Sequence, residues 1–403
     1  MSGDDKTQRG ALITDQRRTG GCCPACGSDR MVSYLDLGTV PVQANEFWPD
    51  ETSAKAADQA PFELAVCQSC GLLSNPAFDP EVISYDGQYE ASLYFSPTFV
   101  EYADQLAEHL ATTQLPQGGT MVELGAGNGD FLVDVCRRAG ASGVAFDPSY
   151  AEGATHRDGV DLRFVGSVDD IGPVEADLLA ARHVVEHLDQ PTELLGSATK
   201  MLRENGRLYL EVPDASFTLD QGGVWDLIYP HVLYFTAPTL AHLAELGGFV
   251  VDRCESTFGG QFLALEGRMG RAGSAPEAPI EHAADVEARL ARLAATIEDR
   301  FEHWRTTLAE HAAAGRGVAV WGAGSKGVTF CHLIGGEAIT HVVDVNPRKH
   351  GRHLPVSGHP VVGPEALADD PPALVLVMNP NYEAEITESV RSAGISADIV
   401  AVS

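Results

Sequence analysis

Apolar and polar positions predict a strand, a turn, a helix and a second strand near the middle of the chain. The run from Met121 to Leu124 is typical of a buried strand, and an amphipathic helix follows it after a glycine-rich turn. A second apolar run, Gly143 to Phe146, ends on Asp147. Strand and helix patterns go on alternating through residues 113–268, which predicts an α/β fold with a parallel sheet covered on both faces.

The pattern predicts several further elements on either side of this unit. Ser96-Pro97 is a helix-start signal, and the apolar stripe from His282 to about Ala314 predicts one long packing helix that bridges two domains. The small and proline-rich residues 271–281 before it indicate a linker. The remaining expected elements are a helix from about Thr98 to Ala111, strands at Leu208 to Val212, Val250 to Glu255 and Phe262 to Gly267, and a helix from about Pro238 capped by Thr236.

Residues 315–403 repeat the strand–turn–helix pattern of nucleotide-binding folds. A strand from Val318 to Trp321 runs into Gly322-Ala-Gly324-Ser325-Lys326-Gly327, and Asp344 ends the next strand 20 residues after Gly324. A helix N-terminus beside a lysine can hold an anion, so Gly324, Ser325 and Lys326 are candidates for a substrate phosphate. The same unit is compatible with an NAD-like cofactor, or with a fold that binds nothing.

The central turn has a tighter spacing, which favours S-adenosylmethionine (SAM) over a dinucleotide. It reads Glu123-Leu-Gly125-Ala126-Gly127-Asn128-Gly129, and SAM has no pyrophosphate to accommodate. Asp147 can accept hydrogen bonds from ribose hydroxyls. The turn resembles motif I of class I SAM-dependent methyltransferases, whose acid helps to hold the methionine end, and residues 176–188 resemble their fourth-strand motif. The predicted SAM-binding residues are Glu123, Gly125, Ala126, Gly127, Asn128, Gly129, Asp147, Pro148 and His183.

The charge of the chain excludes some classes of partner. The formal net charge is −30, from 27 basic and 57 acidic side chains among 403 residues. Nucleic acids and anionic membranes need a positive face, so neither is expected as a partner. Nothing resembles a signal peptide or an apolar run of membrane length, which predicts a cytoplasmic protein. The expected assembly is a monomer or a homodimer, and the expected partner is a small-molecule substrate.

Five of the eight cysteines lie in the first 70 residues, in a pattern typical of zinc ligands. Cys23-Pro-Ala-Cys26 and Cys67-Gln-Ser-Cys70 are two CxxC pairs, each followed by a glycine that suits a knuckle turn. Four thiolates leave no open coordination position, so the expected zinc is structural. Cys22 adjoins the first pair and is expected to be a spare thiol, with the alternative that it competes with Cys23.

The order of these features resembles the sugar C-methyltransferases of antibiotic biosynthesis, which methylate C3 of nucleotide-linked 4-keto-deoxysugars. The resemblance covers roughly residues 20–400 and includes both CxxC pairs, ELGAGNGD, the long helix, GAGSKG, DVNPRKHG and NPNY. It implies a zinc-binding module and a C-terminal Rossmann-like unit on either side of a SAM-binding core. The substrate is then expected between the core and its neighbours.

The chemistry requires a base for the proton next to the ketone and a donor for the enolate oxygen. The family's Tyr-x-Glu-His segment corresponds here to Ile228-Tyr229-Pro230-His231, so the resemblance makes His231 the base. Proline replaces the family's glutamate, and Tyr229 is one place from the family's tyrosine. The candidate catalytic residues are His231, Tyr229, Tyr89, Tyr94 and His187, the two earlier tyrosines belonging to a cluster that is either pocket wall or plain core.

Three classes of function therefore stay open: C-methylation of a nucleotide-linked sugar, methylation of another small biosynthetic intermediate, and a non-catalytic scaffold that binds zinc and a nucleotide. A redox role of the C-terminal unit is a further minor alternative. The expected domains are a disordered tail at 1–20, a zinc-binding module at 21–75, a SAM-dependent methyltransferase domain at 76–270, a linker with the bridging helix at 271–314, and a Rossmann-like domain at 315–403.

Overall fold

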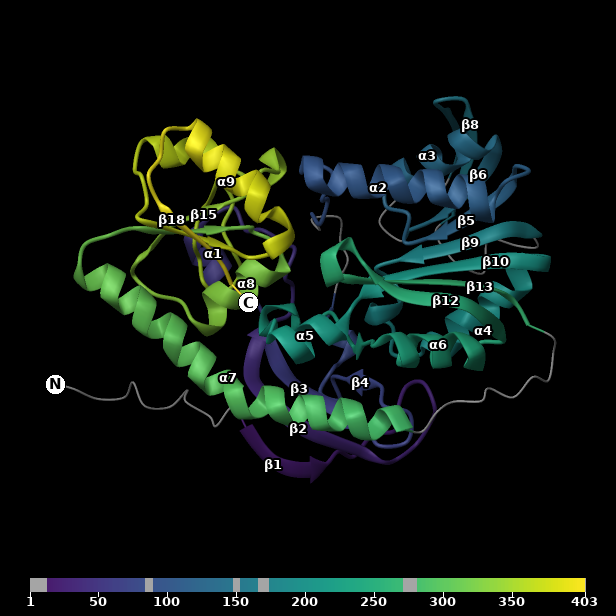
Figure 1. The fold of residues 1–403 in the computed structure, drawn as a ribbon, viewed down its shortest axis with the longest axis horizontal. Coiled ribbons are helices and arrows are strands. Elements are labelled where there is room, and N and C mark those ends of the chain that lie inside the picture. The colour runs from purple at the N-terminus through teal and green to yellow at the C-terminus, as the bar shows by residue number, and fades with distance from the viewer. Residues whose placement is uncertain (1–12, 84–89, 148–152, 166–173, 271–280, 403) are drawn as a thin grey trace.

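Three separate sheets organise the chain (Figure 1). The computed structural model describes residues 13–83, 90–147, 153–165, 174–270 and 281–402. The linker predicted at 271–281 falls almost wholly outside these ranges. Within them, the expected succession of an N-terminal module, an α/β core, a long helix and a second α/β unit is confirmed.

The N-terminal sheet is antiparallel, with the strand order β1-β2-β3-β4-β11. Its strands are β1 (Ile13–Arg18), β2 (Met31–Pro41), β3 (Gln59–Cys67), β4 (Leu73–Ser74) and β11 (Leu233–Tyr234), and α1 (Glu51–Lys55) lies between β2 and β3. Residues 13–18 therefore form a strand, which corrects the expected disorder at that part of the tail. β11 comes from the methyltransferase region, so the module and the core share one sheet.

The central sheet has the order β12-β13-β10-β9-β5-β6-β8-β7, and its five middle strands are parallel as predicted. The strands are β5 (Gly119–Leu124), β6 (Ala141–Phe146), β7 (Gly153–Arg157), β8 (Val160–Val165), β9 (Ala176–Arg182), β10 (Leu202–Pro213), β12 (Phe249–Thr257) and β13 (Phe262–Met269). The accompanying helices are α2 (Pro97–His109), α3 (Asp130–Ala139), α4 (Pro191–Met201), α5 (Ala215–Gln221) and α6 (Ala237–Leu246). The parallel strands point their carboxyl ends, where ligands bind in such sheets, to one edge.

The C-terminal sheet is entirely parallel, in the order β16-β15-β14-β17-β18. It consists of β14 (Val318–Trp321), β15 (Ile339–Val343), β16 (Val361–Val362), β17 (Leu374–Val377) and β18 (Asp398–Ala401), with the helices α8 (Ser325–Leu333) and α9 (Glu383–Ser392). The strands predicted in this unit are confirmed.

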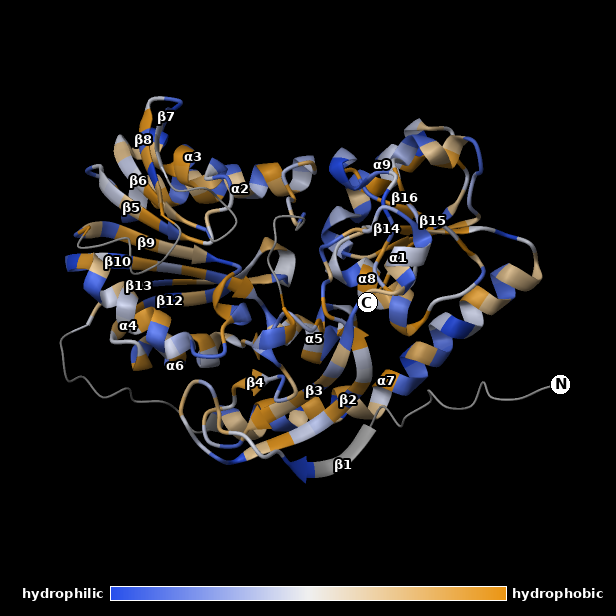
Figure 2. Ribbon diagram, turned by 180° about the vertical axis from the view of Figure 1, so that it is seen from behind, coloured by the Kyte–Doolittle hydropathy of each residue, from blue (hydrophilic) through white to orange (hydrophobic). Residues whose placement is uncertain are grey.

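The helix α7 (Glu281–Ala313) joins the three parts (Figure 1). Its predicted apolar stripe is buried, with Phe301 fully enclosed. Phe301 stacks on Trp225 of the core, and Trp304 meets Phe330 of the C-terminal unit edge-on. Figure 2 shows hydrophobic and hydrophilic residues alternating along this helix. The bridging role predicted for it is confirmed.

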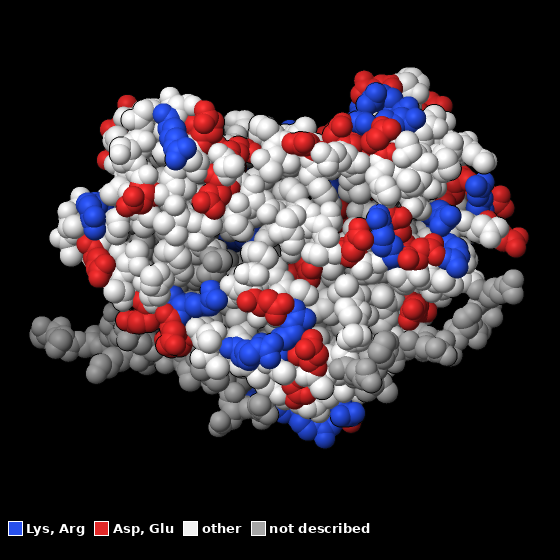
Figure 3. Space-filling model, viewed as in Figure 1, with Lys and Arg blue, Asp and Glu red and all other residues white. Residues whose placement is uncertain are grey.

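Acidic and basic side chains are interspersed on the face drawn in Figure 3. Within the ranges that the structure describes, no helix is both long and apolar enough to cross a membrane.

Candidate active site

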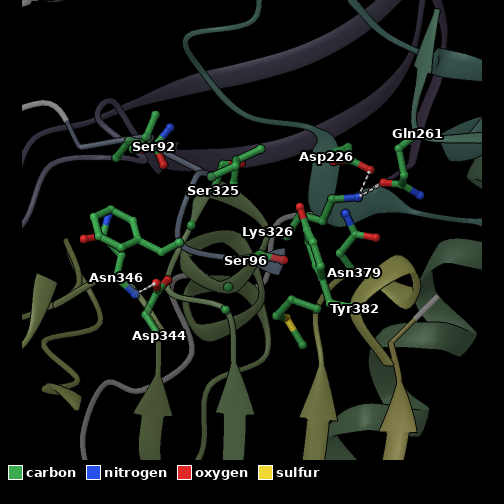
Figure 4. Close-up of a pocket in the computed structure, with 18 of the residues that line it drawn as sticks. Ser92, Ser96, Asp226, Gln261, Ser325, Lys326, Asp344, Asn346, Asn379 and Tyr382 are labelled. Atoms are coloured by element: carbon green, nitrogen blue, oxygen red, sulfur yellow. Dashed lines mark hydrogen bonds and ion pairs between the residues drawn. The ribbon is translucent and has the colours of Figure 1, made fainter. Parts of the chain in front are cut away.

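A pocket of about 320 Å³ lies between the central sheet and the C-terminal unit. The core contributes the segment after β9 and the loop before β11. The C-terminal unit contributes the turn between β14 and α8, where Ser325 and Lys326 lie (Figure 4). The chain before α2 supplies a further wall. Its lining includes His183, Glu186, His187, Asp226, His231, Gln261, Gly322, Gly324, Ser325, Lys326 and Asn346. The structure thus brings the predicted base and the predicted anion site to one pocket.

His187 and His231 form a pair in this pocket, with ring centroids 4.9 Å apart. The ring nitrogen Nδ1 of His187 is 2.9 Å from the carbonyl oxygen of Pro230. Since a carbonyl only accepts, Nδ1 carries the proton and Nε2 keeps its lone pair. Burial, and next the neighbouring His187, lower the pKa of His231 to about 3. His231 is therefore an uncharged imidazole, the form that a general base requires, although so low a pKa also makes the ring a weak base.

Of the candidate tyrosines, the two that the structure describes, Tyr94 and Tyr229, do not line the pocket. The hydroxyl of Tyr229 accepts a hydrogen bond from the backbone amide of Asp79 at 2.8 Å, and the side chain is fully buried. Tyr94 is 39% exposed, packs edge-on against Phe99 and is not among the lining residues. Tyr89 lies outside the described residues. The orientations of the Tyr94 and Tyr229 side chains depend on packing against distant residues, which the local sequence does not show.

The predicted SAM turn connects β5 to α3 with all three alternate glycines at positive φ, between 54° and 79°. A Cβ on Gly125 would come within 2.3 Å of the Val184 side chain, so this position needs glycine. The amide of Gly127 donates to Asp147 at 2.8 Å. Ala126 lies within the turn, whereas the side chain of Asn128 is engaged by Asp130 at 2.6 Å. Pro148 lies outside the described residues.

Glu123 sits at the end of β5 with 3% of its surface exposed. Burial raises its pKa to about 8, against the opposing effect of Arg182, and one carboxylate oxygen has no hydrogen-bond partner among the described residues. A buried carboxylate in this state favours a cationic ligand group. The ammonium of SAM's methionine end fits that requirement, and the glycine turn leaves the backbone open beside it.

A buried charge network that the sequence analysis missed lies between the SAM turn and the pocket. Glu211 of β10 is fully buried, and Arg182 donates to it at 3.1 Å. Tyr102 and Tyr209 donate to the same carboxylate at 2.5 and 2.9 Å. Burial disfavours the charged form of Glu211, but Arg182 and then His183 outweigh it and hold its pKa well below the ordinary value. The available sequence signal was an acid inside the apolar run Leu208 to Val212, within β10.

His183 links this network to the pocket. Its Nδ1 is 3.4 Å from Glu186 and its Nε2 is 3.4 Å from Glu211. Burial opposes a charged ring, but the two carboxylates outweigh it and raise the pKa of His183 to about 9. His183 has a positive φ of 54°, which changes the direction of the chain directly after β9. His183 therefore lines the boundary between the SAM side and the pocket.

The ammonium of Lys326 is held at the pocket wall by two residues of the core. It is 2.8 Å from Asp226 and 2.5 Å from Gln261 (Figure 4). The start of α8 at Ser325, preceded by Gly324, faces the same space. Lys326 thus joins the C-terminal unit to the core in addition to standing beside a helix N-terminus.

Asp344, the acid of the dinucleotide fingerprint, is already satisfied within the protein. One oxygen accepts from the amide of Ala323 and from the ammonium of Lys349, both at 2.9 Å, and the other accepts from the amide of Asn346 at 2.9 Å. Lys349 itself is 4% exposed. A ribose would have to displace these donors, so the geometry disfavours the NAD-like alternative.

The four CxxC cysteines meet as the sequence predicts. The sulfur atoms of Cys23 and Cys70, and those of Cys26 and Cys67, are each 3.6 Å apart, and all four lie within 4.8 Å of one another. Tetrahedral zinc with bonds of about 2.3 Å needs sulfurs about 3.8 Å apart, which matches. The amides of the following glycines close knuckle turns onto the first cysteine of each pair. Cys22 is exposed and outside this cluster.

Comparisons with known proteins match three consecutive parts of the chain. A family model described as "Putative zinc binding domain" matches residues 23–83. The models "Methyltransferase domain" and "C-methyltransferase C-terminal domain" match residues 94–253 and 277–397. These boundaries correspond to the module around the cysteines, the central sheet and the C-terminal unit.

A curated relative matches nearly the whole length. The chain is 26% identical to the C-methyltransferase NovU of Streptomyces niveus, over 92% of each protein. Among solved structures, 1,6-didemethyltoxoflavin-N1-methyltransferase of Burkholderia thailandensis with bound S-adenosylhomocysteine is 19% identical over 42% of this chain and 80% of that one, at a TM-score of 0.33. Mitomycin 7-O-methyltransferase is 18% identical over 42% and 54%, at a TM-score of 0.34. The chain is a SAM-dependent methyltransferase, and its three parts match the models of a zinc-binding domain, a methyltransferase domain and a C-methyltransferase C-terminal domain.

Proposed function

We propose that the enzyme methylates a carbon next to the ketone of a nucleotide-linked deoxysugar. The observation that supports this most directly is the shared pocket, which His231 enters from the core and the Gly322 turn enters from the C-terminal unit. One end offers a neutral imidazole for carbon-acid chemistry, and the other offers a helix N-terminus for a phosphate. SAM supplies the methyl group.

In the proposed reaction, His231 removes the proton from the carbon beside the carbonyl, and the C–H electron pair forms the enolate. The enolate carbon then attacks the methyl group, so that a carbon–carbon bond forms as the carbon–sulfur bond of SAM breaks. S-adenosylhomocysteine leaves, and the proton stays on His231 until solvent takes it. In-line placement of the reacting atoms contributes most of the acceleration in such a transfer. The charged His183 stands close enough to stabilise negative charge at the pocket boundary.

Glu123 is proposed to hold the ammonium of SAM. Glu123→Gln should weaken SAM binding by about 10- to 100-fold, because hydrogen bonds to charged groups contribute about 1.5–3 kcal/mol. Calorimetric titration of SAM measures the loss. Glu101→Gln on the exposed face of α2 is the matched control and should bind SAM as the unaltered enzyme does. Equal affinities of the two variants would remove Glu123 from the SAM site.

Lys326, with Gly324 and Ser325, is proposed to contact the nucleotide phosphate. The double replacement Lys326→Met with Asp226→Asn removes both charges of the pair, so no carboxylate is left without its partner. We expect the KM for the nucleotide acceptor to rise at least about tenfold, equivalent to roughly 1.4 kcal/mol, with unchanged SAM affinity. Steady-state kinetics at saturating SAM give the value.

The exposed pair of Lys55 and Glu51, also replaced by Met and Gln, is the matched control for this prediction. An unchanged acceptor KM in the Lys326 and Asp226 double variant would place the phosphate elsewhere.

The function is tested by incubating the enzyme with methyl-labelled SAM and a panel of nucleotide-linked keto sugars in D₂O. Label should enter one sugar at carbon, and solvent deuterium should enter the position beside the ketone even when SAM is replaced by S-adenosylhomocysteine. Exchange without SAM isolates the deprotonation step. A panel in which no sugar takes up label or deuterium would contradict the proposal.

A second candidate is methylation of a different small biosynthetic intermediate. Pro230 stands at the position of the family's glutamate, and the Tyr229 hydroxyl is bound to the Asp79 amide instead of facing the pocket. Two groups expected for a keto sugar are therefore missing from the lining. Label transfer to a non-sugar acceptor without deuterium exchange would favour this alternative.

A further inference from the structure

Three lining side chains, Glu186, His187 and His231, form a cluster of potential metal ligands. One ligand atom of each lies within 4.8 Å of the other two. Glu186 is 1% exposed, and neither carboxylate oxygen has a hydrogen-bond partner in the part of the chain that is described. The nearest basic atom, Nδ1 of His183, is 3.4 Å away. His183 is a positive group beside Glu186, but it is shared with Glu211 and makes no close hydrogen bond to either, so the buried Glu186 carboxylate is only partly compensated.

The backbone fixes the cluster from two separate loops. Glu186 and His187 belong to a single 3₁₀ turn after β9, Val185–His187. The amide of Val232, next to His231, donates to the Glu186 carbonyl at 2.8 Å and ties the loops together. The His187 Nδ1–H bond to the Pro230 carbonyl orients the ring and leaves Nε2 free. Histidines that bind metals are typically held through their other nitrogen in this way.

We propose that Glu186, His187 and His231 bind a divalent transition-metal ion at the pocket wall, separate from the zinc of the four cysteines. Two imidazoles and one carboxylate are the ligand set that Zn²⁺ and Co²⁺ accept. Bonds of about 2.0–2.1 Å place such ligand atoms about 3.3 Å apart, so side-chain rotations that shorten the separations by up to about 1.5 Å complete the site. All three residues line the pocket, so the ion would lie at its wall.

The bound ion occupies the lone pair with which His231 would accept a substrate proton. Metal binding and deprotonation by His231 therefore exclude each other, and the second ion inhibits the reaction. This consequence rests on the proposed function, whereas the binding of the ion does not. Three protein ligands hold an ion less tightly than four thiolates do, so the cysteine site fills first.

Metal stoichiometry tests the binding. The intact enzyme, with one zinc per chain in the cysteine site, is titrated with Co²⁺ and analysed by elemental mass spectrometry and visible absorption. We expect a second equivalent of metal with ligand-field bands and no added thiolate-to-cobalt charge transfer. Glu186→Gln and His187→Gln should each lower the affinity for this second Co²⁺ at least tenfold. If one variant does not fold, the other alone tests the site.

The matched controls are Glu193→Gln and His156→Gln, which change an exposed glutamate and an exposed histidine and should bind the second ion normally. SAM affinity and zinc content show that each variant is folded. A single equivalent in the unaltered enzyme, or a second one that persists in both cluster variants, overturns the site.

Deuterium exchange separates this inference from the proposed function. With an acceptor that exchanges, the second equivalent of Co²⁺ should suppress the exchange, and chelation should restore it. A second ion that binds through Glu186 and His187 but leaves the exchange rate unchanged would contradict the base role of His231, while the metal site would stand. An unaltered enzyme that exchanges deuterium normally but binds no second ion would contradict the metal site, while the base role of His231 would stand.

Discussion

His231→Gln is expected to lower the rate of methyl transfer about 10²–10⁴-fold, the range that a positioned general base contributes. Glutamine keeps the approximate size and polarity of the side chain but cannot take a proton. SAM affinity should stay the same, because His231 lies in the loop before β11 and the SAM turn lies between β5 and α3. Single-turnover transfer of labelled methyl groups measures the rate, and calorimetry measures SAM binding.

The comparison uses enzyme with one equivalent of zinc, since His231 is also a ligand of the proposed second metal site. His156→Gln on the exposed β7 is the control and should retain full activity. Solvent deuterium exchange should fall together with methyl transfer. A His231→Gln enzyme that still exchanges and methylates would assign the base to another group, with His187 the nearest imidazole.

Cys67→Ser is expected to release the structural zinc and unfold the N-terminal module. Structural zinc contributes about 10–16 kcal/mol to the folding of small zinc domains, which is comparable to the roughly 5–15 kcal/mol that stabilises a whole protein. Cys67 is fully buried at the end of β3, so a serine there also leaves a polar group in the interior. Zinc content and thermal unfolding measure the effect.

The loss of structure should also reduce catalysis, because β4 of the module pairs with β11, which begins two residues after His231. We expect methyl transfer to be lost even where the central sheet survives. Cys22→Ser, one residue before the first ligand and exposed, should keep zinc, stability and activity. A Cys67→Ser enzyme that retains one zinc and an unchanged unfolding temperature would show that the four cysteines do not form the site.

The sequence alone determined the elements whose requirements are local. The three glycines of the SAM turn occupy backbone conformations that other residues rarely adopt, so the turn can be recognised from the spacing of glycines in the sequence. Each CxxC pair is one knuckle turn, and two such pairs define a tetrahedral site. The apolar stripe of α7 likewise follows from a helical period of 3.6 residues, and its buried face matches it.

Only the tertiary structure decided how distant segments combine. Tyr229 adjoins the catalytic segment in sequence, yet its hydroxyl turns to Asp79, about 150 residues earlier. Asp344 fits a dinucleotide fingerprint, but the buried Lys349 and two amides take its oxygens. The cluster of Glu186, His187 and His231, and the Glu211 network, also join separate loops and strands. Such contacts depend on which faces pack together, and that information is spread over the whole core, not contained in any local pattern.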